Sequence, residues 1–256
     1  MTVTDVIRSA RAERVPAITD AIRPSGAGRD RAESVAARIM SVTLVVAVAG
    51  VAVQTVTDLV SFWAFDRAIE LLLADSDVGV FASASIAATF TAALGAWLFS
   101  SVTPERRKLL WFIAGAAAFL SLDDQVGLHE RAGELAEGAV GLEGWEPARL
   151  LWPVLFFPLL AALFFALWRL AGSLAPRARR LVNVGSALLA GAVALELLSA
   201  VVIRAGFDRG SLLYELEVVL EEGAELAGWI LIAGALLSAF VLALREPAVR
   251  MAREGG

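Results

Sequence analysis

Several residue types on which active sites and cofactor sites depend are absent from this chain or occur once. Its 256 residues include no cysteine, one histidine (His129) and one lysine (Lys108). The lack of cysteine excludes disulfides, iron–sulfur clusters, thiolate metal sites and cysteine nucleophiles. A single histidine excludes haem held by two histidines of one chain. The single lysine stands in a short basic loop, where it cannot carry retinal inside a helical bundle.

Motifs of other common active sites are also missing. The chain has no phosphate-binding loop, no Gly-x-Ser-x-Gly elbow and no Glu-x-x-His pair of a ferritin-like di-iron site. Its basic residues stand in short loops and tails without interleaved aromatic residues, so we expect no nucleic-acid partner. These absences leave open whether the protein is an enzyme.

Charged residues are scarce, and apolar residues are gathered into long runs. The chain is 58% hydrophobic and 19% charged, with a mean hydropathy of +0.71, whereas a soluble domain is about half apolar and about a quarter charged. A helix needs about 20 apolar residues to cross a bilayer. We therefore expect an all-α, polytopic bundle of six transmembrane helices, near residues 39–62, 78–102, 109–122, 150–170, 181–203 and 226–244.

The arginines and the lysine are divided unequally between the two sides of these spans. Seven arginines precede the first span, and ten further cations follow the second, fourth and sixth spans. Only five of the 22 arginine and lysine residues would lie on the opposite side of the membrane. Cytoplasmic loops carry the excess of positive charge, so we expect both chain ends in the cytoplasm. This predicts an Arg-rich cytoplasmic tail over 1–38, a transmembrane domain over 39–245 and a cytoplasmic tail over 246–256.

The N-terminal segment does not have the pattern of a secretory signal peptide. Residues 1–38 lack an apolar core, and Pro16, Pro24 and Gly26 should interrupt any long helix there. We expect a multi-pass protein of a bacterial-type inner (cytoplasmic) membrane, with the lipid bilayer as its partner. A homo-oligomer is compatible with the sequence.

The third predicted span is too short to cross the bilayer without acidic residues. Its apolar part, residues 109–122, is about 21 Å long at 1.5 Å per residue, against a hydrocarbon core of about 30 Å. Asp123 and Asp124 should therefore enter the outer leaflet, where a carboxylate must be paired, protonated or hydrated. Glu196 should lie at a similar depth in the fifth span, and Asp58 slightly nearer the outer face.

A glutamate-rich stretch, YELEVVLEEGAEL, leads into the sixth span. At 100° per residue, Glu215, Glu222 and Glu225 share one broad face, whereas Glu217 and Glu221 point away from it. Acidic residues of four spans should therefore gather at one level of the outer leaflet.

These positions define one candidate site whose ligand the sequence does not settle. Carboxylates suit hard divalent ions such as Ca²⁺, Mg²⁺ or Mn²⁺, and they also carry protons. Solvated acids at helix ends would give the same sequence pattern without forming a site. The candidate metal ligands are Asp123, Asp124, His129, Glu130, Glu196, Glu222 and Glu225.

Three functions are compatible with such a site. We favour a transporter or channel that binds a cation or protons, because ionisable residues inside a membrane usually serve such a role. The first alternative is a metal-dependent membrane enzyme with His129 as a ligand and a carboxylate as general base. The second is a sensor or assembly subunit without turnover, whose acids pair with Arg131, Arg204 or another chain.

Overall fold

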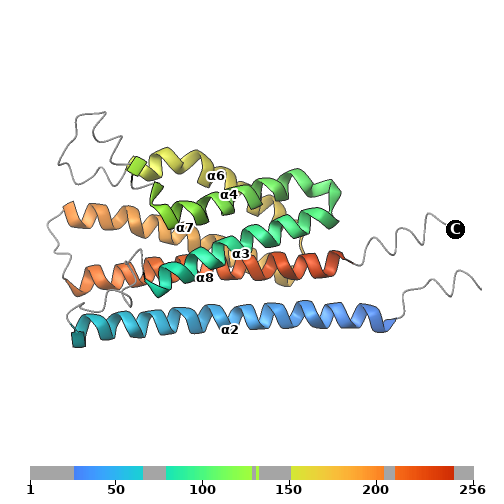
Figure 1. Ribbon diagram of the computed structural model, residues 1–256, viewed down its shortest axis with the longest axis horizontal. Coiled ribbons are helices and arrows are strands. Elements are labelled where there is room, and N and C mark those ends of the chain that lie inside the picture. The colour runs from blue at the N-terminus through green and yellow to red at the C-terminus, as the bar shows by residue number, and fades with distance from the viewer. Residues whose placement is uncertain (1–25, 66–78, 129–130, 133–150, 205–210, 245–256) are drawn as a thin grey trace, which may run out of the picture.

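A set of long helices accounts for nearly all of the described chain. The computed structural model describes residues 26–65, 79–128, 131–132, 151–204 and 211–244, which contain helices and no strand. The helices lie side by side along one axis of an elongated bundle (Figure 1). They are α2 (Gly26–Phe65), α3 (Val80–Val102), a short 3₁₀ helix η2 (Pro104–Arg106), α4 (Arg107–Val126), α6 (Leu151–Ala171), α7 (Pro176–Arg204) and α8 (Leu212–Ala243).

Five helical segments are long and apolar enough to cross a membrane, as a multi-pass membrane protein requires. They are Asp30–Phe65, Val80–Val102, Pro104–Val126, Pro176–Leu198 and Leu212–Ala243. Their outer faces expose large apolar side chains, as lipid-facing surfaces do. The predicted all-α membrane architecture is confirmed at this level. The fourth predicted span, 150–170, corresponds to α6, whose apolar part Leu155–Ala171 is shorter than the other five segments.

Two helices extend beyond the spans that hydropathy predicted. α2 begins at Gly26, so residues 26–38, expected in the tail, are helical and continue into the first span. α8 begins at Leu212, where the Ser211 hydroxyl accepts a hydrogen bond from the Tyr214 backbone N–H at 3.3 Å. Hydropathy detects only the apolar part of a helix. Polar residues on either side of that part can be helical as well, and they extend both helices here. The glutamate-rich stretch is therefore part of the same helix as the apolar residues that follow.

Gly127 ends α4. It has φ 61°, in the left-handed region, and its N–H donates to the carbonyl of Asp123 at 2.7 Å. Residues with a side chain rarely adopt this conformation, and glycine does so without strain. The stop at Gly127 sets Asp123 and Asp124 in the last turn of α4.

α8 is the central helix of the bundle. It packs against α2, α3 and α7, whereas α4 packs against α3, and α6 packs against α4 and α7 (Figure 1). Most of α8 is buried, and Ile232, Ala235 and Leu236 have no exposed surface. Side chains on every face of this helix therefore meet another helix along much of its length.

A close contact between two glycines sets the register of α7 against α8. A Cβ added to Gly185 would lie 2.7 Å from the carbonyl oxygen of Gly228, and one added to Gly228 would lie 2.8 Å from the Leu189 side chain. Small residues allow transmembrane helices to approach this closely. Because the two helices run antiparallel, this crossing places Glu196 of α7 opposite the turn of α8 that contains Glu221.

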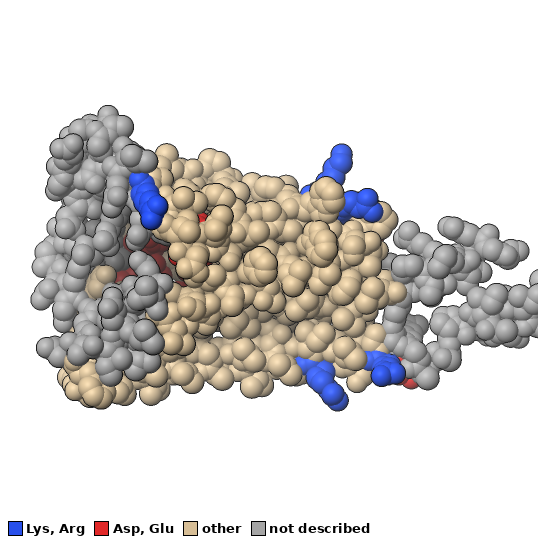
Figure 2. Space-filling view, viewed as in Figure 1, with Lys and Arg blue, Asp and Glu red and all other residues tan. Residues whose placement is uncertain are grey.

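The two ends of the bundle carry opposite charge. We use "basic end" for the end where α6 and α8 finish and where Arg106, Lys108, Arg169 and Arg179 lie, and "acidic end" for the opposite end, where α2, α4 and α7 finish. Figure 2 shows most of the visible Lys and Arg side chains at the first, and acidic side chains recessed below the surface near the second. Arg131, at the acidic end, is exposed.

Replacement of Gly228 by alanine should force α7 and α8 apart. We expect Gly228→Ala to lower the free energy of unfolding by about 1–3 kcal/mol, the usual effect of overpacking. Gly191→Ala is the matched control, because a Cβ at this α7 position would meet nothing within 4 Å. Unfolding of both variants in detergent measures the difference. Equal stability of the two would contradict the close crossing.

Candidate functional site

Asp123 is held inside the bundle at the end of α4. Its side chain is 2% exposed, and that of Asp124 is half-buried. The Ser121 hydroxyl, half a turn earlier, donates to the carbonyl of Ile86 at 3.0 Å and joins α4 to α3. A carboxyl buried among apolar helices must be hydrogen-bonded, paired or protonated. The buried position of Asp123 at the end of α4 is compatible with the short apolar run that precedes it.

Ser85 connects the beginning of α3 to α8. Its hydroxyl donates to Oε1 of Glu225 at 3.4 Å, a long hydrogen bond. Ser85 precedes Ile86, the residue to which the end of α4 is bonded. Glu225 of α8 and Ser121 of α4, two residues before Asp123, thus approach the same turn of α3. The structure brings the predicted site residues Glu225 and Asp123 to one level of the bundle.

Glu196 of α7 lies in a second acidic group, centred on Glu221 of α8. The negative charges of Glu196, Glu217 and Glu222 all act on Glu221, and Glu217 precedes Glu221 by one helical turn. A carboxylate only accepts hydrogen bonds, so a hydrogen bond between two carboxyl groups requires a proton on one of them. A proton on one of these carboxyls would relieve the repulsion among them, so the group is suited to hold a proton.

The position of Glu217 and Glu221 differs from the expectation that they point away from the site. At 100° per residue Glu221 lies about 40° from Glu225, so helical periodicity does not separate the two faces, and Glu221 is turned toward Glu196 of α7. Only the packing of α7 against α8, a contact between segments distant in sequence, shows this. The predicted site residue Glu196 therefore lies near Glu221 of α8. Asp123, another predicted site residue, lies at a different place in the bundle.

One face of α2 adds further polar groups at the acidic end. Gln54, Asp58 and Ser61 recur at intervals of four and three residues, and each is at most 1% exposed. α2 is antiparallel to α8, and a Cβ added to Gly223 would lie 3.3 Å from the Val51 side chain. Residues 54–61 follow Val51 along α2, so this polar face lies beside the first turns of α8. Glu215 in those turns is also 1% exposed.

The amide of Gln54 and the hydroxyl of Ser61 have no hydrogen-bond partner within the part of the chain that the structure describes. A buried polar group without a partner costs about 1–3 kcal/mol, and such groups often bond to water or an ion. Sequence reasoning noted Asp58 and missed these two, because an uncharged polar residue is unremarkable in a transmembrane helix. The spacing 54–58–61 was the available signal.

The described acids do not form a closed metal cage. Within the residues that the structure describes, no three Asp, Glu or His side chains lie together as a metal ion would require. His129 and Glu130 lie outside the described residues, so the predicted ligation of Ca²⁺, Mg²⁺ or Mn²⁺ by the full set stays a prediction. Among the described members of that set, Glu225 lies beside Ser85 of α3, whereas Glu196 and Glu222 lie near Glu221 where α7 meets α8.

A family model described as "Domain of unknown function (DUF8692)" matches residues 37–239. The chain belongs to this family. The matched region contains α3, α4, α6 and α7 whole, with most of α2 and α8, so both acidic groups lie within the family domain. No curated protein and no solved structure is significantly similar to the chain.

Proposed function

We propose that the protein crosses a bacterial-type inner membrane six times, with both ends in the cytoplasm. α6 has 21 residues, which is about 31 Å at 1.5 Å per residue and matches a hydrocarbon core of about 30 Å. The unequal distribution of arginine between alternate loops supports an even number of spans. In this arrangement the basic end faces the cytoplasm and the acidic end lies in the outer leaflet.

Single cysteines test this topology without background, because the chain has none. Arg149→Cys precedes α6 and Arg177→Cys follows it, so the two should lie on opposite sides of the membrane. We expect a membrane-impermeant maleimide to label Arg149→Cys in intact cells and Arg177→Cys only after permeabilisation. Labelling of both variants from the same side would contradict α6 as a span.

We propose that the acidic end binds protons or another cation during transport, as part of a transporter or channel. The observation that carries this proposal is the meeting of Glu196 from α7 with Glu217 and Glu221 from α8. Carboxyl groups inside a membrane are energetically costly and therefore rare. Those that occur usually mark an ion or proton pathway. Their arrival from two helices at one place is the arrangement that such a pathway requires.

A proton suits this geometry better than a divalent ion. A divalent ion such as Ca²⁺ takes six to eight oxygen ligands at fixed distances, whereas a proton needs only two carboxyls in contact. Glu217 and Glu221, one turn apart on α8, could share one. The polar face of α2 and the Ser85–Glu225 hydrogen bond extend the polar region across the bundle, so a transferred proton has further acceptors nearby.

Removal of the titratable groups should abolish proton movement without unfolding the protein. We expect Glu221→Gln and Glu196→Gln each to reduce proton flux about tenfold or more, because an amide cannot release and rebind a proton. Flux is measured in proteoliposomes with a pH-sensitive dye enclosed in the lumen. Asp30→Asn, an exposed position near the beginning of α2, is the control and should leave flux unchanged.

Two results would count against the proposal. One is wild-type flux in both glutamine variants, which would remove the glutamates from the pathway. The other is absence of proton flux in the wild type together with thermal stabilisation by Ca²⁺, Mg²⁺ or Mn²⁺ that Glu221→Gln removes. That second outcome would assign the same residues to a divalent ion.

A further inference from the structure

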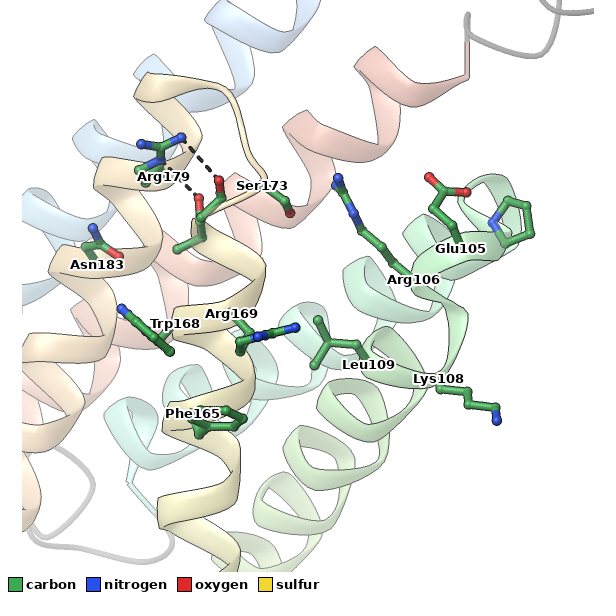
Figure 3. A pocket seen from close by; sticks show the side chains of 13 residues that line it. Glu105, Arg106, Lys108, Leu109, Phe165, Trp168, Arg169, Ser173, Arg179 and Asn183 are labelled. Carbon is green, nitrogen blue, oxygen red and sulfur yellow. Dashed lines mark hydrogen bonds between the residues drawn. The ribbon is translucent and has the colours of Figure 1, made fainter.

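The basic end contains a cavity, separate from the acidic groups. Its volume is about 1140 Å³, and it lies between η2 and the beginning of α4 on one side and the α6–α7 connection on the other (Figure 3). Four cationic side chains and one acidic side chain line it: Arg106, Lys108, Arg169, Arg179 and Glu105. The cavity therefore favours an anionic ligand.

Arg179 forms part of the wall of this cavity. Its Nε donates to the carbonyl of Ala171 at 3.1 Å, and one terminal nitrogen donates to Gly172 at 3.3 Å and Leu174 at 3.4 Å. These bonds satisfy carbonyls left open where α6 ends. Arg179 thus holds the α6–α7 connection in place while its charge remains beside the cavity.

Arg106 and Arg169 are the cations that a ligand could reach from two sides. Figure 3 shows Arg106 extending from η2 and Arg169 from α6 into the space between them, whereas Lys108 points away. Arg169 is exposed and Arg106 is half-buried. A guanidinium is a planar donor of several N–H groups and suits phosphate oxygens. Two of them facing one space form a recognition site for a phosphate group.

The other wall of the cavity is aromatic and continues as an apolar strip. Phe165 and Trp168 line the cavity with 60% and 67% of their side chains exposed. Phe157, on the same face of α6 two turns before Phe165, is 67% exposed. Cations at one end of a long apolar face match a ligand with an anionic head and hydrocarbon chains.

We propose that this cavity binds an anionic phospholipid of the inner leaflet, with its phosphate between Arg106 and Arg169. The acyl chains lie along the α6 face of Phe157 and Phe165. Basic pockets between transmembrane helices on the cytoplasmic side are suited to such headgroups. A free phosphate ion would contact the arginines and leave the aromatic wall unused. The inference rests on the proposed topology and not on transport.

Lipid binding to the purified full-length protein in neutral detergent tests this site. We expect phosphatidylglycerol to bind by native mass spectrometry, and Arg106→Gln and Arg169→Gln each to weaken its apparent affinity about fivefold, the effect of one lost cation near a membrane surface. Arg169→Lys should retain most of the binding. Arg177→Gln is the control, because Arg177 is an exposed arginine of the same end outside the cavity.

Three outcomes would overturn the proposal, and none depends on transport. Equal binding of phosphatidylcholine would show that the arginines do not select charge. Equal weakening by Arg177→Gln would show diffuse surface attraction. Displacement of phosphatidylglycerol by millimolar inorganic phosphate would indicate a free anion site. If Arg169→Gln does not fold, the site is tested by Arg106→Gln together with phosphatidylglycerol, phosphatidylcholine and inorganic phosphate as ligands.

Discussion

The enclosure of α8 by three other helices is the constraint on which the rest of the structure depends. The first half of this helix carries five glutamates, and α2, α3 and α7 pack around it while one apolar face, with Leu216 and Leu220, stays exposed. A carboxyl group that is buried in such a bundle is not hydrated by bulk water. It must find a hydrogen bond, another carboxyl that shares a proton, or a cation. The Ser85–Glu225 bond is one of these solutions, and the group of Glu196, Glu217 and Glu221 is suited to another.

The placement of these acids follows from a few packing contacts. The approach of Gly185 to Gly228 sets the register that brings Glu196 to Glu221, and the left-handed Gly127 ends α4 just after its two aspartates. The bonds from Ser121 and Ser85 fix α4 and α8 to one turn of α3. Opposite, the basic end holds its arginines around a cavity bordered by aromatic side chains.

Properties that depend on local composition could be predicted from the sequence. The all-helical architecture, with several helices long and apolar enough to span a membrane, follows from the length of the apolar runs. The pairing of Glu196 with Glu221 could not be predicted, because it depends on how two helices distant in sequence cross. Helical periodicity shows which glutamates share a face of α8, and only packing shows which helix that face meets.

The distance between positions 196 and 221 tests this account most directly. In the cysteine-free chain, Glu196→Cys combined with Glu221→Cys should cross-link readily in membranes with a short bifunctional maleimide. Glu196→Cys combined with Leu220→Cys should do so much less, because Leu220 is 61% exposed and faces away from the neighbouring helices. Efficient cross-linking of the second pair and none of the first would contradict the meeting of α7 and α8 at Glu221.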